Sequence, residues 1–188
     1  MGMPQLQQPW TAAMVRELPA DGKRYEVVSG ELLVTPAPTF DHQEAVGNLF
    51  LRLRVHLRAH LVGHAAMSPA DIELDTHTLV QPDVFVVPLV QGRRPRTWAE
   101  IPGLLLAVEV LSPSTARADR TIKRRRFQAE GVHEYWIVDV EARLVERWRP
   151  EDLRPEILTE TLVWQPDPAV EPLVVSLPDF FNEVLGAA

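Results

Sequence analysis

Two acidic residues interrupt strongly apolar stretches of the sequence, and they are the first candidates for chemistry. Glu109 lies within LLLAVEVL at 104–111, and Asp83 precedes VFVVP at 84–88. An ionised carboxylate inside a dry strand costs several kcal/mol unless a partner compensates its charge. An arginine, a strand end that reaches solvent, or a turn after Pro82 would account for the acids structurally. A shared divalent cation would account for both chemically.

The metal interpretation depends on where the two strands lie. Neighbouring strands are about 4.8 Å apart, so carboxylates on the same face of adjacent strands can bind one cation. Mg²⁺ is held by one or two carboxylates, with water and substrate phosphate completing its shell, and the pair Asp83 and Glu109 fits that requirement. We therefore predict a Mg²⁺ site that Mn²⁺ could also fill. The sequence leaves the adjacency of the two strands open.

Lys123 is the third candidate and lies in the basic run DRTIKRRRF at 119–127. Four-residue spacing puts Asp119, Lys123 and Phe127 on one helical face, and a solvated helix with an Asp119–Lys123 ion pair is one interpretation. In the other, the short connection after the strand that contains Glu109 folds the helix back over the end of the sheet. Lys123 would then orient or help deprotonate a water near the metal and offset charge on a phosphate.

The net charge of -7 argues at first against a nucleic-acid partner, because such partners usually bind basic proteins. The charge is unevenly distributed, however. Residues 93–126 contain nine basic and three acidic side chains, whereas residues 151–188 contain one basic and eight acidic. Beside a phosphodiester site, basic side chains would contact DNA phosphates, and the candidates are Arg117, Arg120 and Arg124. Away from such a site they would form a solvated face.

Composition limits the class of protein and its compartment. Cysteine is absent, which excludes disulfides, thiolate metal sites and cysteine nucleophiles. The start, MGMPQLQQPW, lacks a charged region followed by an apolar run, and no apolar stretch approaches about 18 residues. We therefore expect a cytoplasmic protein with no membrane partner. With 188 residues, 46% of them hydrophobic, and no Gly/Ser-rich linker, the chain is predicted to form a single domain over residues 1–188.

The elements that must position these residues follow from periodicity and turn signals. The predicted helices cover 11–18, 41–63, 116–130 (starting at Ala116 or Asp119) and 179–185. The predicted strands lie within 24–28, 31–35, 71–75, 79–90, 104–111, 135–140, 144–148 and 157–164. This order predicts an α/β fold with a central mixed sheet flanked by helices, an extra N-terminal hairpin and extra C-terminal strands.

Four motifs together resemble the Uma-two family of restriction-endonuclease-like proteins: QPD at 81–83, VEVLSPST at 108–115, DRxxK at 119–123 and GVxEYWIVD at 131–139. The segment RYEVVSGELLVTPAPTFDHQ at 24–43 matches as well, and the resemblance is strongest over residues 15–150. The resemblance implies the PD-(D/E)XK nuclease fold, in which helices flank a restriction-endonuclease-like mixed sheet. It also implies an endonuclease, with Asp83 as the motif aspartate and Glu109 as the second acid.

One position departs from the general superfamily pattern. Leu111 stands two residues after Glu109, where the motif lysine is expected, and the family resemblance moves that charge to the next helix, where Lys123 matches. The retained acids and Lys123 favour a Mg²⁺-dependent endonuclease that hydrolyses DNA. The departure favours the alternative, a non-catalytic nucleic-acid-binding or protein-interaction domain on a nuclease-like scaffold. Because cutting both strands calls for two sites, we also expect a homodimer, although no sequence feature fixes its interface.

The matched stretch and the superfamily pattern supply three additional site candidates. The superfamily sometimes places a metal-associated glutamate on its first core helix, which makes Glu44 a candidate, although its spacing from Asp41 is also close to that of a capping box. His42 and Glu31 lie in the matched stretch at 24–43. Structurally, His42 would instead begin the helix and Glu31 would pair across the hairpin.

Overall fold

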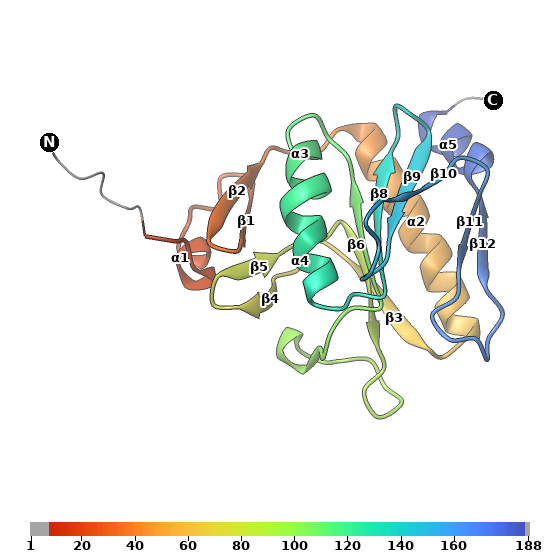
Figure 1. Ribbon diagram of the computed structural model, residues 1–188, viewed down its shortest axis with the longest axis horizontal. Coiled ribbons are helices and arrows are strands. Elements are labelled where there is room, and N and C mark those ends of the chain that lie inside the picture. Colours follow the sequence, from red (N-terminus) through yellow and green to blue (C-terminus); the bar gives the residue numbers. More distant parts are fainter. Residues whose placement is uncertain (1–7, 187–188) are drawn as a thin grey trace, which may run out of the picture.

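A six-stranded mixed sheet forms the centre of the structure, a computed structural model that describes residues 8–186 (Figure 1). Its strand order is β10-β9-β8-β7-β6-β3, in which β7 and β8 are parallel and the other neighbours antiparallel. The strands are β3 (Gly63–Met67), β6 (Val84–Pro88), β7 (Leu106–Val110), β8 (Glu134–Asp139), β9 (Leu144–Trp148) and β10 (Glu156–Leu158). The predicted central mixed sheet is confirmed.

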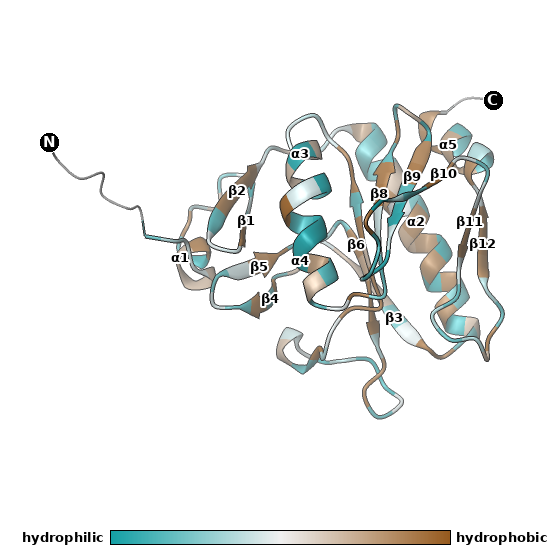
Figure 2. Cartoon of the chain, viewed as in Figure 1, coloured by the Kyte–Doolittle hydropathy of each residue, from teal (hydrophilic) through white to brown (hydrophobic). Residues whose placement is uncertain are grey.

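Helices cover both faces of this sheet, so its central strands are buried on each side. One face carries α2 (Phe40–Ala59) and α5 (Leu177–Leu185), whose apolar side chains join the core of β6, β7 and β8. The opposite face carries one helical segment, made of α3 (Ala116–Ala118), a π-helical turn η2 (Asp119–Lys123) and α4 (Arg124–Ala129). Teal parts of this segment in Figure 2 are hydrophilic.

The pleat of β6 and β7 decides which face each candidate acid points to. Successive residues of a strand point to opposite faces of the sheet. Phe85 and Ala107 belong to the core beneath α4, whereas their strand neighbours belong to the core beneath α2. Asp83 and Glu109 lie two residues from Phe85 and Ala107 along the strands, so both acids point to the side that α4 covers.

A smaller antiparallel sheet adjoins the N-terminal part of the chain, with strand order β2-β1-β5-β4. Its strands are β1 (Arg24–Val28), β2 (Glu31–Thr35), β4 (Ile72–Asp75) and β5 (Thr78–Val80). β1 and β2 form the predicted N-terminal hairpin with the predicted bounds. Ser29 and Gly30 at its turn both have positive φ, 52° and 83°, as a two-residue type I′ turn requires.

The prediction was wrong about the end of α2 and missed β3. The helix ends at Ala59, whereas the prediction extended it to Gly63; it starts at Phe40, one residue before the predicted start at Asp41, with Thr39 as its N-cap. Gly63 starts a strand. A Cβ at this position would lie 2.9 Å from the Val87 carbonyl oxygen, so the close packing of β3 on β6 requires glycine there.

The C-terminal part contains more strands than predicted. The predicted strand at 157–164 is divided between β10, which pairs with β9, and β11 (Thr161–Trp164). The unpredicted β12 (Leu173–Ser176) pairs with β11. α1 (Ala12–Arg16) and the short helix η1 (Trp98–Glu100) complete the elements. Across residues 8–186, no helix has the combination of length and apolar character needed to cross a bilayer.

Candidate active site

Asp83 and Glu109 lie next to each other, as a shared cation would require. β6 and β7 pair with Val84 opposite Val108, and the same register carried one residue outward sets Asp83 opposite Glu109. The backbone N–H of Val110 donates to Asp83 Oδ2 over 2.9 Å. Only 4% of Asp83 and 3% of Glu109 is exposed. The adjacency that the sequence left open is therefore present.

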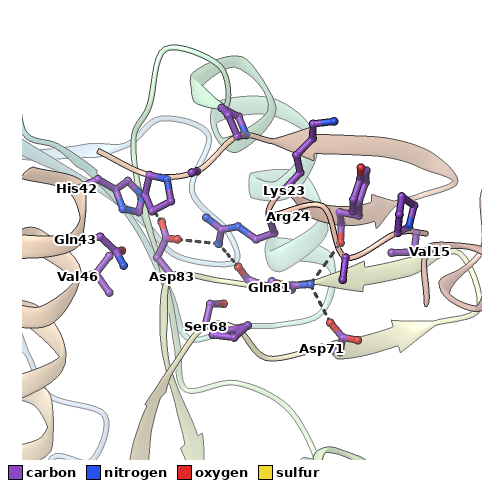
Figure 3. Close-up of a pocket in the computed structure, with 18 of the residues that line it drawn as sticks. Val15, Lys23, Arg24, His42, Gln43, Val46, Ser68, Asp71, Gln81 and Asp83 are labelled. Carbon is purple, nitrogen blue, oxygen red and sulfur yellow. Dashed lines mark hydrogen bonds and ion pairs between the residues drawn. The ribbon is translucent and has the colours of Figure 1, made fainter. Parts of the chain in front are cut away.

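Two cavities meet at Asp83. One has a volume of about 270 Å³ and is lined by Asp83, Glu109 and Lys123 together with the loop at 112–115. The other, of about 480 Å³, shares Asp83 and His42 with the first, and Figure 3 shows the side chains around it. The candidate acids are thus buried yet border open space in which a ligand could lie.

Lys123 contacts Glu109, one of these two acids, and is not a solvated surface residue. It is 2% exposed, and its Nζ lies 3.0 Å from Glu109 Oε1, 2.7 Å from Glu26 Oε2 and 3.6 Å from Asp119 Oδ1. Burial would lower the pKa of Lys123, but these three carboxylates outweigh it and raise the pKa above its ordinary value. Lys123 therefore holds a permanent positive charge between three acids.

Asp83 is held in its ionised form by two further side chains. Arg24 donates to Asp83 Oδ1 over 2.8 Å and also to the Gln81 carbonyl, while His42 Nε2 lies 3.1 Å from Oδ2. Figure 3 shows Arg24 and His42 directed at the carboxylate. Burial alone would raise the pKa of Asp83, but the hydrogen bond with His42 and the charge of Arg24 lower it to about 2.

Glu109 has the opposite character. Burial raises its pKa well above the ordinary value, and the nearby carboxylates of Asp83, Asp119 and Glu26 add to that rise, which the charge of Lys123 offsets only in part. Burial also raises the pKa of Asp119. Its surroundings therefore disfavour the charged form of Glu109, and a bound cation would stabilise that form.

The donor set fits a hard divalent cation. Two permanent cations face four buried carboxylates, namely Arg24 and Lys123 against Glu26, Asp83, Glu109 and Asp119. The cluster thus has excess negative charge when all its acids are ionised, and a bound cation would remove that excess. Among the described residues, no three His, Asp or Glu side chains form a group suited to hold a metal. Two carboxylates beside an open cavity suit Mg²⁺, which keeps several waters, better than Zn²⁺.

Sequence reasoning missed two members of the cluster, Arg24 and Glu26. Both lie on β1, and Glu26 is 1% exposed. Its Oε1 accepts from the Gln81 backbone N–H over 2.7 Å, which ties the smaller sheet to the segment before Asp83. Glu26 could have been predicted in the same way as Glu109, because it is also an acid inside a run of strand-forming residues, RYEVV at 24–28.

The three additional candidates occupy different places. His42 lies in the cluster, through its contact with Asp83. Glu44 is half-buried on α2 and does not line either cavity at Asp83. Glu31 is exposed at the start of β2, opposite Val28. The structure therefore brings His42 to the site and leaves Glu44 and Glu31 outside it.

The three arginines proposed for phosphate contacts differ in their availability. Arg120 Nε donates to Glu146 Oε1 over 2.6 Å, and the Arg124 guanidinium lies 4.7 Å from the centre of the Trp148 ring. Arg117 is exposed and forms no ion pair with any other described residue. Arg117 is thus the readiest of the three to bind an external phosphate, because the other two already have partners on β9.

The fold is similar to that of a solved protein. It resembles a crystal structure described as "a putative nuclease belonging to DUF820" from Anabaena variabilis, with a TM-score of 0.71 and 18% sequence identity. The match covers 94% of this chain and 99% of that chain. At this identity the likeness concerns the fold alone, and it agrees with the predicted restriction-endonuclease-like architecture.

The family follows from the sequence match. The Uma2 family model, described as "Putative restriction endonuclease", matches residues 12–178, and the chain belongs to this family. The resemblance identified from the four motifs is therefore confirmed. None of the curated proteins matches the sequence.

Proposed function

We propose that this protein is a Mg²⁺-dependent endonuclease that hydrolyses DNA phosphodiester bonds, with Asp83, Glu109 and Lys123 as its catalytic residues. One observation carries the proposal: the three side chains come from the residue just before β6, from β7 and from η2, yet they line one cavity. Family membership supports nuclease chemistry, and the excess of buried carboxylates supports a divalent cation as the cofactor, with Mn²⁺ as its substitute.

Each residue has a separate task in this proposal. Mg²⁺ held by Asp83 and Glu109 would supply Lewis-acid activation of the scissile phosphate and of a water. Arg24 and His42 keep Asp83 ionised and so able to bind a cation. Lys123, whose proton is firmly held, orients the attacking water and offsets charge on the phosphate rather than removing a proton itself.

The position of the lysine bears on the choice between catalysis and binding alone. Leu111 stands where the superfamily pattern has its lysine, but the Lys123 ammonium reaches Glu109 Oε1 from the helix, at 3.0 Å. The charge that phosphodiester hydrolysis needs is thus provided from a different element. This contact favours the endonuclease over a non-catalytic binding domain.

We further infer that residues 1–188 act as one domain and that Arg117 contacts the DNA backbone. The one-domain proposal is supported by a shared core, in which Trp164 of β11 and Phe180 of α5 pack with Val108 of the central sheet. Exposure near the loop at 112–115 supports the role of Arg117, and such phosphate contacts position nucleic acid without reading its sequence.

Cleavage of supercoiled plasmid DNA, followed on gels with Mg²⁺ or Mn²⁺ and after chelation, tests the proposal. Asp83→Asn and Glu109→Gln should each lower the rate at least about a hundredfold. Glu134→Gln is the matched control, because this carboxylate lies in β8 and lines neither cavity at Asp83, so it should cleave like the wild type.

Equal cleavage by all four proteins would refute the proposed site. A wild-type protein that binds DNA without cleaving it, and keeps that affinity after Asp83→Asn, would instead support the non-catalytic nucleic-acid-binding alternative. Calorimetric titration with Mg²⁺ separates the two cases further, because the endonuclease requires a metal site that depends on Glu109.

A further inference from the structure

The solvent side of α2 carries an apolar stripe that the single chain does not use. Its core side buries Leu49, Leu53 and Leu57, as an amphipathic helix should. On the opposite side, Leu51 is 60% exposed and Val55 is 62% exposed. Neighbouring exposed apolar side chains of this kind are typical of an interaction surface. An aromatic residue, Phe40, is also exposed on this side, at the first position of the helix.

We define the outer α2 face by six residues that follow one another at spacings of three or four along the helix: Phe40, Glu44, Gly47, Leu51, Val55 and Arg58. Residues at these spacings lie on one side of a helix, one above the other. The helix has 20 residues, so this face runs for about 30 Å. Phe40 is 77% exposed at its start.

The outer α2 face is self-complementary about Leu51. Glu44 and Arg58 lie seven residues before and after it, and Gly47 and Val55 lie four before and after it. A two-fold axis through Leu51 would therefore set Glu44 of one copy against Arg58 of the other, twice, and Val55 against Gly47, twice. Neither Glu44 nor Arg58 forms an ion pair within residues 8–186. Opposite charges and apolar residues are thus arranged as an isologous interface requires.

Gly47 gives a second, independent observation. Glycine is the poorest helix former after proline, yet Gly47 lies in the middle of α2, where it is exposed. A Cβ added at Gly47 would meet nothing within 4 Å, so no contact inside the chain requires glycine. Close approach of a second helix, with Val55 of the other copy opposite, would require it.

We propose that the outer α2 face is a homodimer interface, in which the α2 helices of two copies pack antiparallel about a two-fold axis at Leu51. The second copy is the occupant because the face complements itself in charge and in shape. The cavity at Glu109 and Lys123 is also lined by Thr39 and His42 at the start of α2, so only the first residue of the outer α2 face, Phe40, adjoins a residue that lines this cavity. The proposal does not depend on nuclease activity.

Sedimentation equilibrium of the full chain over a range of concentrations tests the interface. The wild type should form a reversible dimer, and Leu51→Glu should raise its dissociation constant at least about a hundredfold, because two carboxylates would meet at the axis. Val174→Glu is the matched control, since Val174 is equally exposed, at 60%, but lies on β12, and it should leave the dimer unchanged. Far-UV circular dichroism and melting curves establish that each variant is folded.

The charge pairs test the register. Glu44→Arg and Arg58→Glu should each weaken the dimer about tenfold or more, because each change sets like charges against each other twice. The double variant, with both changes, restores the opposite pairs and should return to within about threefold of the wild type. A wild type that stays monomeric, a dimer that survives Leu51→Glu or is broken by Val174→Glu, or a double variant as weak as the single ones would each overturn the proposal.

Discussion

The buried ammonium of Lys123 gives the most direct test of the cluster as a physical unit. Lys123→Met keeps the length and apolar stem of the side chain but removes a charge that three carboxylates contact, at 2.7, 3.0 and 3.6 Å. Removing one partner of a buried ion pair typically costs about 3–5 kcal/mol, because the other charge stays buried without compensation. For a chain of this size that loss corresponds to a fall in Tm of about 6–20 °C.

Urea unfolding at neutral pH without divalent cations measures this loss. Lys23→Met is the matched control, because the Lys23 side chain is 51% exposed and water screens its pair with Asp21, so this change should leave the stability nearly unchanged. Lys123→Met combined with Glu109→Gln should recover part of the stability, because the second change removes one of the uncompensated carboxylates. A loss below about 1 kcal/mol in Lys123→Met, or no recovery in the double variant, would refute the electrostatic account of the cluster.

Three further predictions concern pH, metal and packing. The lowered pKa of Asp83, about 2 against 3.8, contributes about 2 kcal/mol that is present above the unfolded-state value and lost as pH falls toward 2, so urea unfolding of Asp83→Asn should show a shallower acid dependence. Because the raised pKa of Glu109 lets protons compete with the cation, the increase in Tm on adding Mg²⁺ should grow with rising pH and vanish in Glu109→Gln; an increase that is independent of pH would contradict this. Gly63→Ala should destabilise the fold by about 1–3 kcal/mol in denaturant titrations, because its Cβ would meet Val86 and Val87 at 2.9 Å, and unchanged stability would contradict the close packing of β3 on β6.

The catalytic candidates could be predicted from the sequence because they violate its local pattern. Asp83 and Glu109 are acids at or inside apolar strands, and such a residue needs a partner wherever the strand lies. The hairpin of β1 and β2 was equally predictable, since alternating strand formers flank a Ser29-Gly30 turn. In these cases the information is local, so no knowledge of the tertiary fold was needed.

The other features depend on contacts between distant segments. Glu26 joins the site because β1 lies beside Gln81 and Lys123, and no spacing rule links residues that far apart. The ion pair of Arg120 could not be predicted for the same reason, because its partner Glu146 lies on β9, 26 positions away. β3 was missed because GHAAM lacks the β-branched and aromatic residues that mark strands, so pairing with β6 determines it.

The π-helical turn η2 ties the function of the site to the length of its helix. This turn holds one residue more than an α-helical turn would, and it lies between the loop at 112–115 and Phe127, which is fully buried in the core. Because a π turn accommodates one extra residue, deleting one residue within 119–122 would allow a regular α-helical turn there and leave Phe127 in place relative to residues 116–118. Deleting one residue from the regular helix at 124–126 would instead rotate Phe127 by about 100° relative to Lys123. The first deletion should therefore lower the melting temperature less than the second.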